Sequence, residues 1–406
     1  MTETLHGPVH RTRPTSSADP FSAELLADPH EFHEALREAG EVVHLERYDV
    51  DAMGRYDTVH AALTDWQSFE SSAGVGISDF RREPPWRPPS LLLEADPPHH
   101  DAPRAVLQKI LGPRALRALE PQWRADAAAL VDEVLARGTE FDAVTELAEA
   151  FPLRVFPDAV GLRQEGREHL LPYGDHLFNT FGPENFLVQH GAPSLPEHAG
   201  WVNEQCARDA LAPTGFGADI WAATDRGDIT EAQAPLMVRS LLSAGVDTTI
   251  HALGAILAAF ARTPEAWAAL RSNPALARVA FDEAIRLESP VQTFFRTTTR
   301  DVEIDGVRIP EGRKILMFLG SANRDPRRWS DPGRFDLHRD PSGHVGFGMG
   351  IHQCVGQHVA RLEAVALLTA LAARVETIEP AGTPTRHLNN TLRAWETLPV
   401  RLTPDR

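Results

Sequence analysis

Cys354 lies in the part of the sequence with the clearest potential for chemistry. The stretch 343–356 reads GHVGFGMGIHQCVG and holds five glycines in fourteen residues. Glycine allows the backbone to approach a ligand closely and to adopt positive φ angles. A helical pattern over 355–375 begins directly after the cysteine. We therefore expect Cys354 at a helix N-terminus, where free amide groups and the helix dipole favour a thiolate over a thiol.

This loop allows three interpretations. Cys354 can be a buried structural residue beside a flexible turn, the axial ligand of a haem iron, or part of a zinc site with nearby histidines: His344, His352 and His358. Zinc sites usually have paired ligands at short fixed spacing, which these residues lack. A phosphate-binding loop is less favoured still, because the glycines do not complete the dinucleotide-binding pattern and no clear strand precedes them.

The second unusual segment is 231–260, which is apolar nearly all round, as expected of a helix buried in the centre of a large protein. Thr230 and Gln233 fit a capping box at its start, but Pro235 falls within the first turns, so the helix can begin a few residues later. In its middle, residues 244–249 (AGVDTT) are poor helix formers. Such a conflict between local propensity and a buried helix is expected at a functional site.

Helical periodicity dominates the rest of the chain. An apolar face recurs at three- and four-residue steps between 116 and 134, which predicts an amphipathic helix. Strand patterns are fewer: 302–304 and 307–309 flank Asp305-Gly306, a strong hairpin signal, and 314–319 predicts a further strand. The sequence therefore predicts a mainly α fold of the α+β kind, a large helical domain with small antiparallel β patches.

Bulk properties limit the environment and the partners. The chain of 406 residues is 42% hydrophobic and 24% charged, as in an ordinary soluble protein. A net charge of −17 argues against nucleic acid as a partner. Two cysteines without framework spacing indicate a reducing compartment, and we see no signal peptide or membrane-spanning run. We expect a cytoplasmic protein without membrane contact, with a flexible tail over 1–19 and one catalytic domain over 20–406.

These residues resemble those of a known family. Residues 347–356 (FGMGIHQCVG) closely match the cysteine-loop signature of the cytochromes P-450, the haem-thiolate monooxygenases, and the resemblance runs along nearly the whole chain from about Asp19. It implies the P-450 fold, a haem b bound through the thiolate of Cys354, and insertion of one oxygen atom from O2 into a substrate. It also implies an iron–sulfur ferredoxin with its reductase as electron donor, docked on basic residues: Lys109, Arg114 and Arg361.

The resemblance implies roles for further residues. Four side chains are expected to bind the haem propionates: His100, Arg104, Arg296 and His352. His99 is the alternative to its neighbour His100. Glu283 and Arg286 resemble the family's Glu-x-x-Arg pair, a folding determinant that we expect to link to Arg334.

Asp247 and Thr248 resemble the family's acid–alcohol pair in the central helix. A simpler interpretation is that Thr248 bonds back to a carbonyl oxygen and bends the helix. The resemblance adds that this bend opens a groove for dioxygen beside Ala244 and Gly245. Thr248 then donates a hydrogen bond during oxygen activation, and Asp247 relays protons. Thr248→Ala is expected to keep substrate binding while reducing equivalents are lost as hydrogen peroxide.

Four segments resemble one subgroup of the family, the bacterial members that oxidise para-substituted benzoates, notably by converting 4-methoxybenzoate to 4-hydroxybenzoate. They are 71–98, 178–183 (FNTFGP), 238–245 (VRSLLSAG) and 289–296 (SPVQTFFR). The stretch 185–199 (NFLVQHGAPSLPEHA) departs from the subgroup, so ring size and tolerated substituents stay open. By composition alone, 84–89 (PPWRPP) reads as an exposed extended loop.

This likeness implies a substrate site. Residues expected around a substrate carboxylate are Arg87, Ser90, Arg239 and Ser240, with Ser243 on the same helix face. Those expected to clamp the ring are Phe178, Phe181, Val291 and Phe294, and Ala244 is also expected to belong to the substrate site. Arginine suits this role because its planar fork matches a carboxylate. The alternatives are a hydroxylase of another small acid or a terpenoid, and a haem-thiolate sensor that does no oxidation. We expect the protein to be a monomer.

Overall fold

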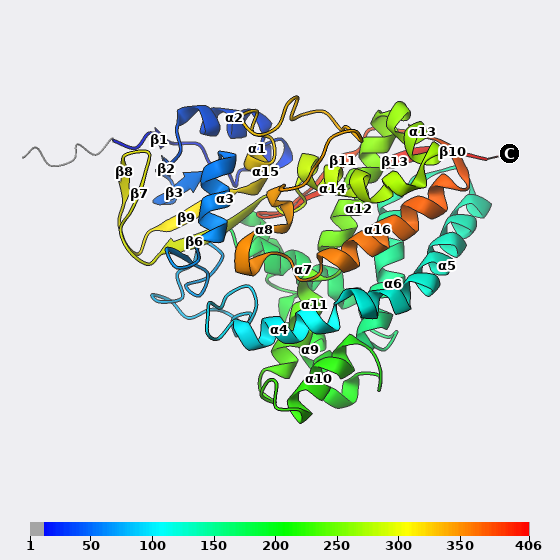
Figure 1. Ribbon diagram of the computed structural model, residues 1–406, viewed down its shortest axis with the longest axis horizontal. Coiled ribbons are helices and arrows are strands. Elements are labelled where there is room, and N and C mark those ends of the chain that lie inside the picture. The colour runs from blue at the N-terminus through cyan, green and yellow to red at the C-terminus, as the bar shows by residue number, and fades with distance from the viewer. Residues whose placement is uncertain (1–11, 406) are drawn as a thin grey trace, which may run out of the picture.

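Helices make up most of the fold, as the sequence predicted. The computed structural model describes residues 12–405 (Figure 1). Its α-helices are α1 (Ala23–Ala27), α2 (His30–Ala39), α3 (Tyr56–Thr64), α4 (Asp101–Ile110), α5 (Pro113–Arg137), α6 (Ala150–Val160), α7 (Leu170–Asn179), α8 (Phe186–Gly191), α9 (Leu195–Gln205), α10 (Phe216–Asp225), α11 (Ala234–Ala244), α12 (Asp247–Arg262), α13 (Pro264–Ser272), α14 (Ala277–Glu288), α15 (Leu319–Ala322) and α16 (Gln357–Ala372).

The strands are short and gather into one larger sheet and three small ones. They are β1 (Thr15–Ser16), β2 (Val43–Leu45), β3 (Val50–Met53), β4 (Phe69–Glu70), β5 (Glu140–Asp142), β6 (Thr293–Thr298), β7 (Val302–Ile304), β8 (Val307–Ile309), β9 (Lys314–Phe318), β10 (Val375–Pro380), β11 (Thr385–Leu388), β12 (Arg393–Thr397) and β13 (Pro399–Pro404). The larger sheet has the order β1-β2-β3-β9-β6-β4. Most strand pairs are antiparallel, but β1 with β2 and β3 with β9 are parallel.

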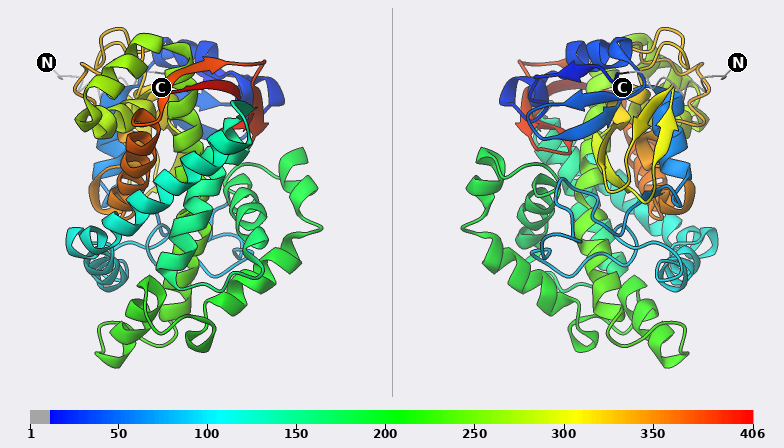
Figure 2. Two further views of the ribbon diagram at one scale, coloured as in Figure 1. Left: turned by 90° about the vertical axis from the view of Figure 1, so that its right-hand side faces the viewer. Right: turned by 90° about the vertical axis from the view of Figure 1, so that its left-hand side faces the viewer.

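The sheet and the helices occupy different sides of the molecule. In Figure 1 the larger sheet lies beside α2 and α3, whereas α5, α13 and α16 lie on the opposite side. Figure 2 shows α9 and α10, in green, at the end furthest from the blue N-terminal elements. The predicted amphipathic helix is α5, whose buried residues Trp123, Ala127 and Val131 follow the predicted face. The predicted hairpin is β7–β8, in which Asp305 and Gly306 have φ angles of 49° and 74°.

The N-terminal segment differs in part from the expected flexible tail over 1–19. Residues 1–11 lie outside the described residues. Thr15–Ser16, however, form β1 and pair with β2, and the Arg13 guanidinium donates to Asp51 at 2.8 Å. The segment from residue 12 is therefore attached to the larger sheet through backbone and ion-pair contacts.

The central helix is broken where its sequence predicted a conflict. It starts at Ala234, later than the predicted 231, and Gln233 closes a turn with Thr230 immediately before it. It stops at Ala244 and resumes as α12 at Asp247. The stretch Ala234–Arg262 is long and apolar enough to cross a membrane by length and composition. Because most of it is buried within the protein, we interpret it as the core helix.

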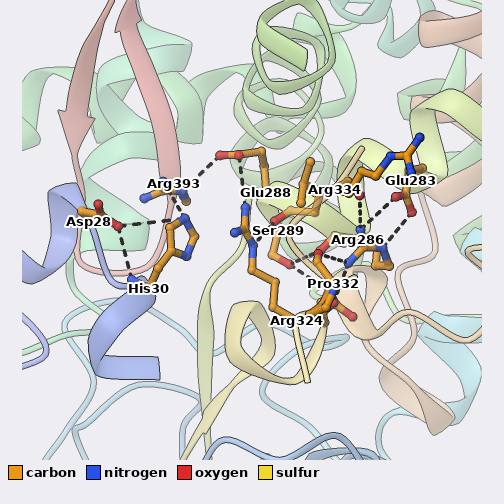
Figure 3. Close-up of polar contacts among 12 residues, drawn as sticks. Asp28, His30, Glu283, Arg286, Glu288, Ser289, Arg324, Pro332, Arg334 and Arg393 are labelled. Carbon is orange, nitrogen blue, oxygen red and sulfur yellow. Dashed lines mark hydrogen bonds and ion pairs between the residues drawn. The ribbon is translucent and has the colours of Figure 1, made fainter. Parts of the chain in front are cut away.

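A buried ion cluster on α14 holds the segment that leads to the cysteine loop (Figure 3). Glu283 and Arg286 are both fully buried and form two hydrogen bonds of 2.7 and 2.8 Å. Arg286 also donates to the carbonyl oxygens of Asn323, Pro332 and Arg334. The Glu-x-x-Arg pair therefore fixes the backbone at three positions of the segment 323–334, as expected of a folding determinant.

The expected ionic link to Arg334 is wrong. The guanidinium that reaches Glu283 belongs to Arg339, whose Nε donates to Oε1 at 3.1 Å. Arg334 contributes only its carbonyl oxygen to this cluster, as Figure 3 shows. Asn323 extends the cluster, because its Oδ1 accepts from the amide of Val345 at 2.8 Å. This hydrogen bond therefore fixes the position of the backbone at the start of the cysteine loop.

Candidate active site

A buried cavity lies between the break in the central helix and the cysteine loop. Its walls come from segments far apart in the sequence: the loop 87–93, α4, α7, α11, α12, β6 and residues 346–360. It brings together most of the predicted site residues: Arg87, Ser90, Arg104, Phe178, Phe181, Arg239, Ser240, Ser243, Ala244, Thr248, Val291, Phe294, Arg296, His352 and Cys354. The two predicted residues that do not line it are His100 and Asp247.

The cysteine loop is held by its own backbone. The amide of Cys354 donates to the carbonyl oxygen of Phe347 at 2.8 Å. Gly350 has a φ angle of 67°, and a Cβ there would lie 2.8 Å from the carbonyl oxygen of Leu63, so only glycine fits this turn. The following helix, α16, begins at Gln357, two residues after the predicted start.

The sulfur of Cys354 lies where an anion is partly stabilised. Burial raises the pKa of its thiol, whereas hydrogen bonds from the amides of Gly356 and Gln357 and the charge of Arg104 act to lower it. A metal cation in the cavity would attract the negatively charged sulfur and so favour the thiolate over the thiol. The geometry therefore fits a metal-ligating cysteine better than a structural one.

Two cationic side chains on the cavity fit the propionates of a haem. Arg104 donates to the carbonyl oxygen of Gln353 at 2.5 Å, and its Nε has no partner among the described residues. Arg296 is 2% exposed, and its one hydrogen bond within residues 12–405 goes to the carbonyl oxygen of Phe295. Burial lowers the pKa of Arg296 to about 10. Since an unpaired buried charge is costly, both residues favour an anionic group here.

The two predicted histidines differ in their surroundings. His352 lines the cavity, but both ring nitrogens already have partners: the carbonyl oxygen of Leu92 at 3.0 Å and Asp96 at 3.1 Å. His100 is 2% exposed and packs behind His352, with ring centroids 4.9 Å apart. Its Nε2 has no partner among the described residues, whereas His99 is exposed. Of the two neighbours, His100 is therefore the one that faces inward.

The zinc interpretation finds no support. His344 is buried and accepts a hydrogen bond from the amide of Gly346, and burial lowers its pKa to about 3. His358 is exposed on α16. Within the part of the chain that the structure describes, no three His, Cys, Asp or Glu side chains gather as a metal site would require.

The acid–alcohol pair lies at the start of α12. Thr248 lines the cavity and its hydroxyl donates to the carbonyl oxygen of Ala244 at 2.9 Å, across the break. The simpler interpretation of this residue therefore also holds. Asp247 is buried behind it, and its Oδ2 has no partner among the described residues. Gly245 lies in the break, where a Cβ would come within 2.5 Å of the ring of Phe156. Glycine at this position therefore lets the ring of Phe156 pack against the break.

The predicted carboxylate-binding residues meet on another wall. Arg239 is 5% exposed and donates to the carbonyl oxygen of Pro88 at 2.6 Å. The hydroxyls of Ser90 and Ser240 lie 3.4 Å apart, which joins the loop 87–93 to α11. Ser243 follows on the same helix face and also lines the cavity.

This wall carries an unbalanced positive charge. Arg87 pairs with Glu94 through hydrogen bonds of 2.9 and 3.3 Å. Arg239 has no carboxylate partner among the described residues, and burial followed by the charge of Arg87 lowers its pKa. Two guanidinium groups and one carboxylate leave one positive charge uncompensated. A ligand carboxylate would balance it.

Aromatic side chains line the cavity next to this charge. Phe178 and Phe181 lie edge to face with ring centroids 5.7 Å apart, and Phe294 lies 6.0 Å from Phe181. All three, together with Val291, line the cavity and belong to one apolar cluster. The cavity therefore offers an aromatic, apolar wall next to a cationic one.

Sequence reasoning missed two acidic residues that organise this site. Glu94 is 5% exposed and also accepts the amide of Ser90 at 2.7 Å, so it fixes the loop that carries Arg87. Asp96 holds His352. The only signal was the presence of two carboxylates in the otherwise apolar stretch LLLEADPP at 91–98.

The sequence of this chain is similar to those of known proteins. A sequence model described as Cytochrome P450 matches residues 274–398. Cytochrome p450 CYP199A2 of Rhodopseudomonas palustris is 57% identical over 391 residues, which cover 96% of this chain and 95% of that protein. Cytochrome P450-terp of a Pseudomonas species is 31% identical over 325 residues, 77% of this chain and 76% of that protein.

Solved structures show the same fold. The structure of cytochrome P450 CREJ in complex with (4-ethylphenyl) dihydrogen phosphate aligns with a TM-score of 0.86 at 27% identity, over 95% of this chain and 99% of that one. The structure of CYP109Q5 from Chondromyces apiculatus aligns with a TM-score of 0.80 at 30% identity, over 96% and 98% of the two chains.

Proposed function

This chain belongs to the cytochrome P450 superfamily, and we propose that it oxidises a para-substituted benzoate. The proposed reaction converts 4-methoxybenzoate to 4-hydroxybenzoate. The family establishes a haem-thiolate monooxygenase that uses O2 and an external electron donor. The observation that carries the substrate proposal is the uncompensated charge of Arg239 on the wall of the same cavity as Cys354.

We assign the site residues to three roles: binding the haem iron, binding the haem propionates, and supplying protons. When bound, the haem supplies oxygen activation and oxygen transfer. We assign Cys354 as its thiolate ligand and four residues as propionate partners: His100, Arg104, Arg296 and His352. The hydroxyl of Thr248 can turn from the carbonyl oxygen of Ala244 and donate into the cavity, and Asp247 holds a proton behind it.

We propose that the substrate carboxylate binds between Arg239 and the hydroxyls of Ser90 and Ser240. Arg87 stays paired with Glu94 and adds charge without losing its own partner. Phe178, Phe181 and Phe294 contact the substrate ring and direct its para substituent toward Cys354. A rigid, partly prearranged pocket of this kind reduces the ordering cost of binding.

Titration with 4-methoxybenzoate and its neutral amide tests this proposal. We expect the acid to bind more tightly than 4-methoxybenzamide by roughly 10²-fold, since hydrogen bonds to charged groups contribute about 1.5–3 kcal/mol. Arg239→Met should remove that difference, while Arg208→Met, at an exposed arginine on the surface, should keep it. The spin-state change of the haem absorption spectrum measures both affinities. Equal affinity for acid and amide in the wild-type protein would eliminate the carboxylate site.

Product analysis separates this function from its alternatives. Formation of 4-hydroxybenzoate and formaldehyde supports demethylation. Tight binding of a terpenoid instead of the benzoate would favour the other hydroxylases, and binding without any oxidation would favour a sensor. We further propose that the chain acts as a cytoplasmic monomer whose residues 20–406 form a single catalytic domain, to which the segment with β1 is attached through the larger sheet.

An iron–sulfur ferredoxin is the proposed electron donor. Of the three expected docking cations, Lys109 and Arg114 are exposed, but Arg361 is partly buried and bound to Asp282 at 2.8 Å. Arg361 also lies against the ring of Phe347, 4.6 Å from its centroid. It therefore supports the cysteine loop and is a poor docking residue.

Charge reversal of the exposed pair tests this surface. In Lys109→Glu combined with Arg114→Glu, we expect reduction by an acidic ferredoxin to slow on the order of tenfold at low salt, with a weaker salt dependence, because electrostatic steering is lost. Arg226→Glu, at an exposed arginine before α11, is the control. Stopped-flow reduction rates measure the effect. An unchanged rate in the double variant would exclude this surface.

A further inference from the structure

A row of polar side chains behind the cavity belongs to neither the haem site nor the substrate site. His387 on β11 lies between two carboxylates: its Nε2 is 2.7 Å from Asp175 of α7, and its Nδ1 is 2.9 Å from Glu396 of β12. Asp175 is further held by Asn389 at 2.8 Å and Asn179 at 3.1 Å. The side chains of His387, Asp175 and Glu396 are 34%, 36% and 58% exposed, so this row reaches solvent.

Asp247 packs against the turn of α7 that carries Asp175. Asp247 lies against α7 at Gly174, where a Cβ would come within 1.7 Å of its Oδ2. Gly174 directly precedes Asp175, so a glycine is what allows the Asp247 carboxyl to lie beside the row. The same Oδ2 has no hydrogen-bond partner among the described residues. An unpaired carboxyl oxygen in this position is free to exchange a proton.

We propose that His387 and Asp175 relay protons from solvent to Asp247, which passes them to Thr248 at the cavity. Monooxygenation consumes two electrons and two protons for each O2, with one oxygen atom leaving as water. The external donor supplies the electrons, and the protons must cross the protein. This role goes beyond the acid–alcohol pair, because it assigns the supply to residues of α7 and of the C-terminal hairpin.

The transfers balance one proton at a time. Asp247, which starts protonated, delivers its proton to the hydroxyl oxygen of Thr248, which simultaneously gives its own proton into the cavity. The Asp247 carboxylate then turns toward Asp175. Nε2–H of His387 gives its proton to Oδ1 of Asp175, Asp175 passes it to Oδ2 of Asp247, and solvent returns a proton to the imidazole beside Glu396.

The electrostatics favour the inner transfer, from Asp175 to Asp247. Burial, followed by the charge of Asp175, raises the pKa of Asp247 well above its ordinary value, which favours the protonated carboxyl. Burial alone would raise the pKa of Asp175, but hydrogen bonds from His387 and Asn389 lower it overall. The hydrogen bond to Asp175 raises the pKa of His387 to about 9. His387 therefore favours its charged form and Asp247 its neutral form.

Other titratable groups face the row and set its pH response. Two further groups interact electrostatically with the row. One is His251, which lies on α12 with Asp247, and the other is Glu149, at the end of the π-helical turn Val144–Glu149. Burial lowers the pKa of His251 to about 4, so it remains neutral at neutral pH. Burial raises the pKa of Glu149. His387 is thus the one group facing this row, among the described residues, that is cationic at pH 7.

Three substitutions in the full-length, haem-loaded protein test the relay: His387→Gln, Asp175→Asn and Glu396→Gln. We expect the first two to slow turnover of 4-methoxybenzoate on the order of tenfold at pH 7 and to increase the solvent isotope effect, since proton supply becomes limiting. The affinity for 4-methoxybenzoate should not change. Thr385→Val, which removes the exposed 2.8 Å bond to Thr397 in the same hairpin, is the matched control and should behave as wild type.

Glu396→Gln gives a milder variant if the other two substitutions impair folding. It removes a negative charge beside His387 and so lowers the pKa of the imidazole. Because the relay needs protonated His387, the rate falls as pH rises through that pKa, and the alkaline limb of the pH–rate profile should move to lower pH. A profile identical to that of wild type would overturn the relay, as would full turnover with a wild-type isotope effect in folded His387→Gln and Asp175→Asn.

A spectroscopic arm needs no turnover and stands even if 4-methoxybenzoate is not the substrate. Imidazole nitrogen NMR should place the pKa of His387 at about 9 in wild type and closer to its ordinary value of about 6.5 in Asp175→Asn. Infrared difference spectra should show a protonated carboxyl band that is lost in Asp247→Asn. If this band is absent in wild type, Asp247 holds no proton and the relay is refuted.

Discussion

Replacing Cys354 with serine is expected to abolish oxygenation and to remove the thiolate signature from the spectrum of the reduced, carbonyl-bound haem. Serine is nearly isosteric, so the fold of the loop should survive. Its hydroxyl, however, ionises far less readily than a thiol. The amides of Gly356 and Gln357 act to lower the pKa of the Cys354 thiol, but an alcohol is a far weaker acid than a thiol and its oxygen is a poorer electron donor to the metal than a thiolate sulfur. The cavity then lacks the electron-donating ligand that favours O–O cleavage.

The absorption spectrum and the product yield measure this effect. Cys206→Ser is the matched control, because Cys206 is the other cysteine of the chain. It is buried, its sulfur lies 3.1 Å from the carbonyl oxygen of Val202, and burial raises its pKa to about 12, so it stays a thiol. We expect this control to keep the thiolate spectrum. A Cys354→Ser protein with the wild-type spectrum would refute the ligand assignment.

Glu283→Gln is expected to cause the largest loss of stability. The substitution leaves the guanidinium of Arg286, 0% exposed, without its charged partner and also removes the partner of Arg339. Breaking a buried pair on one side costs roughly 3–5 kcal/mol. The three carbonyl contacts of Arg286 orient the loop that leads to Cys354, so we expect the haem to dissociate early in the unfolding transition.

Urea unfolding followed by circular dichroism and by haem absorption measures this loss. Glu120→Gln is the control, since Glu120 pairs with Arg124 at 2.8 Å on the exposed face of α5. An exposed pair of this kind contributes at most about 1 kcal/mol. If Glu283→Gln loses no more stability than the control, the buried cluster is not a folding determinant.

Local features of the sequence predicted local features of the structure. The hairpin at Asp305-Gly306 follows from the positive φ angles that these residues tolerate. The break between Ala244 and Asp247 follows from poor helix formers within an apolar helix. The positions of Arg239 and Ser240 on one wall with Ser90 came from the family resemblance, because no spacing in the sequence relates residues 150 positions apart.

Other contacts could not be foreseen. Arg334 and Arg339 are both arginines in the segment after β9, and only the path of the loop decides that the second one reaches Glu283. The pairing of Arg87 with Glu94 removed one of the two charges that the sequence offered to a substrate. Two helix starts also moved: α11 begins at Ala234, directly after the turn between Thr230 and Gln233, and α16 begins at Gln357, two residues after the predicted start.

Short stretches of residues were enough to predict the metal-binding loop, the helical class of the fold and the type of chemistry, because these features depend on residue identity within short windows. The folded structure was needed to show which charges are paired and which are left free. Pairing depends on distances of a few ångströms between segments such as α7 and β11, which lie 212 positions apart at Asp175 and His387. Charge interactions fall off within such distances, so the free cation Arg239 and the free carboxyl oxygen of Asp247 emerge only after folding.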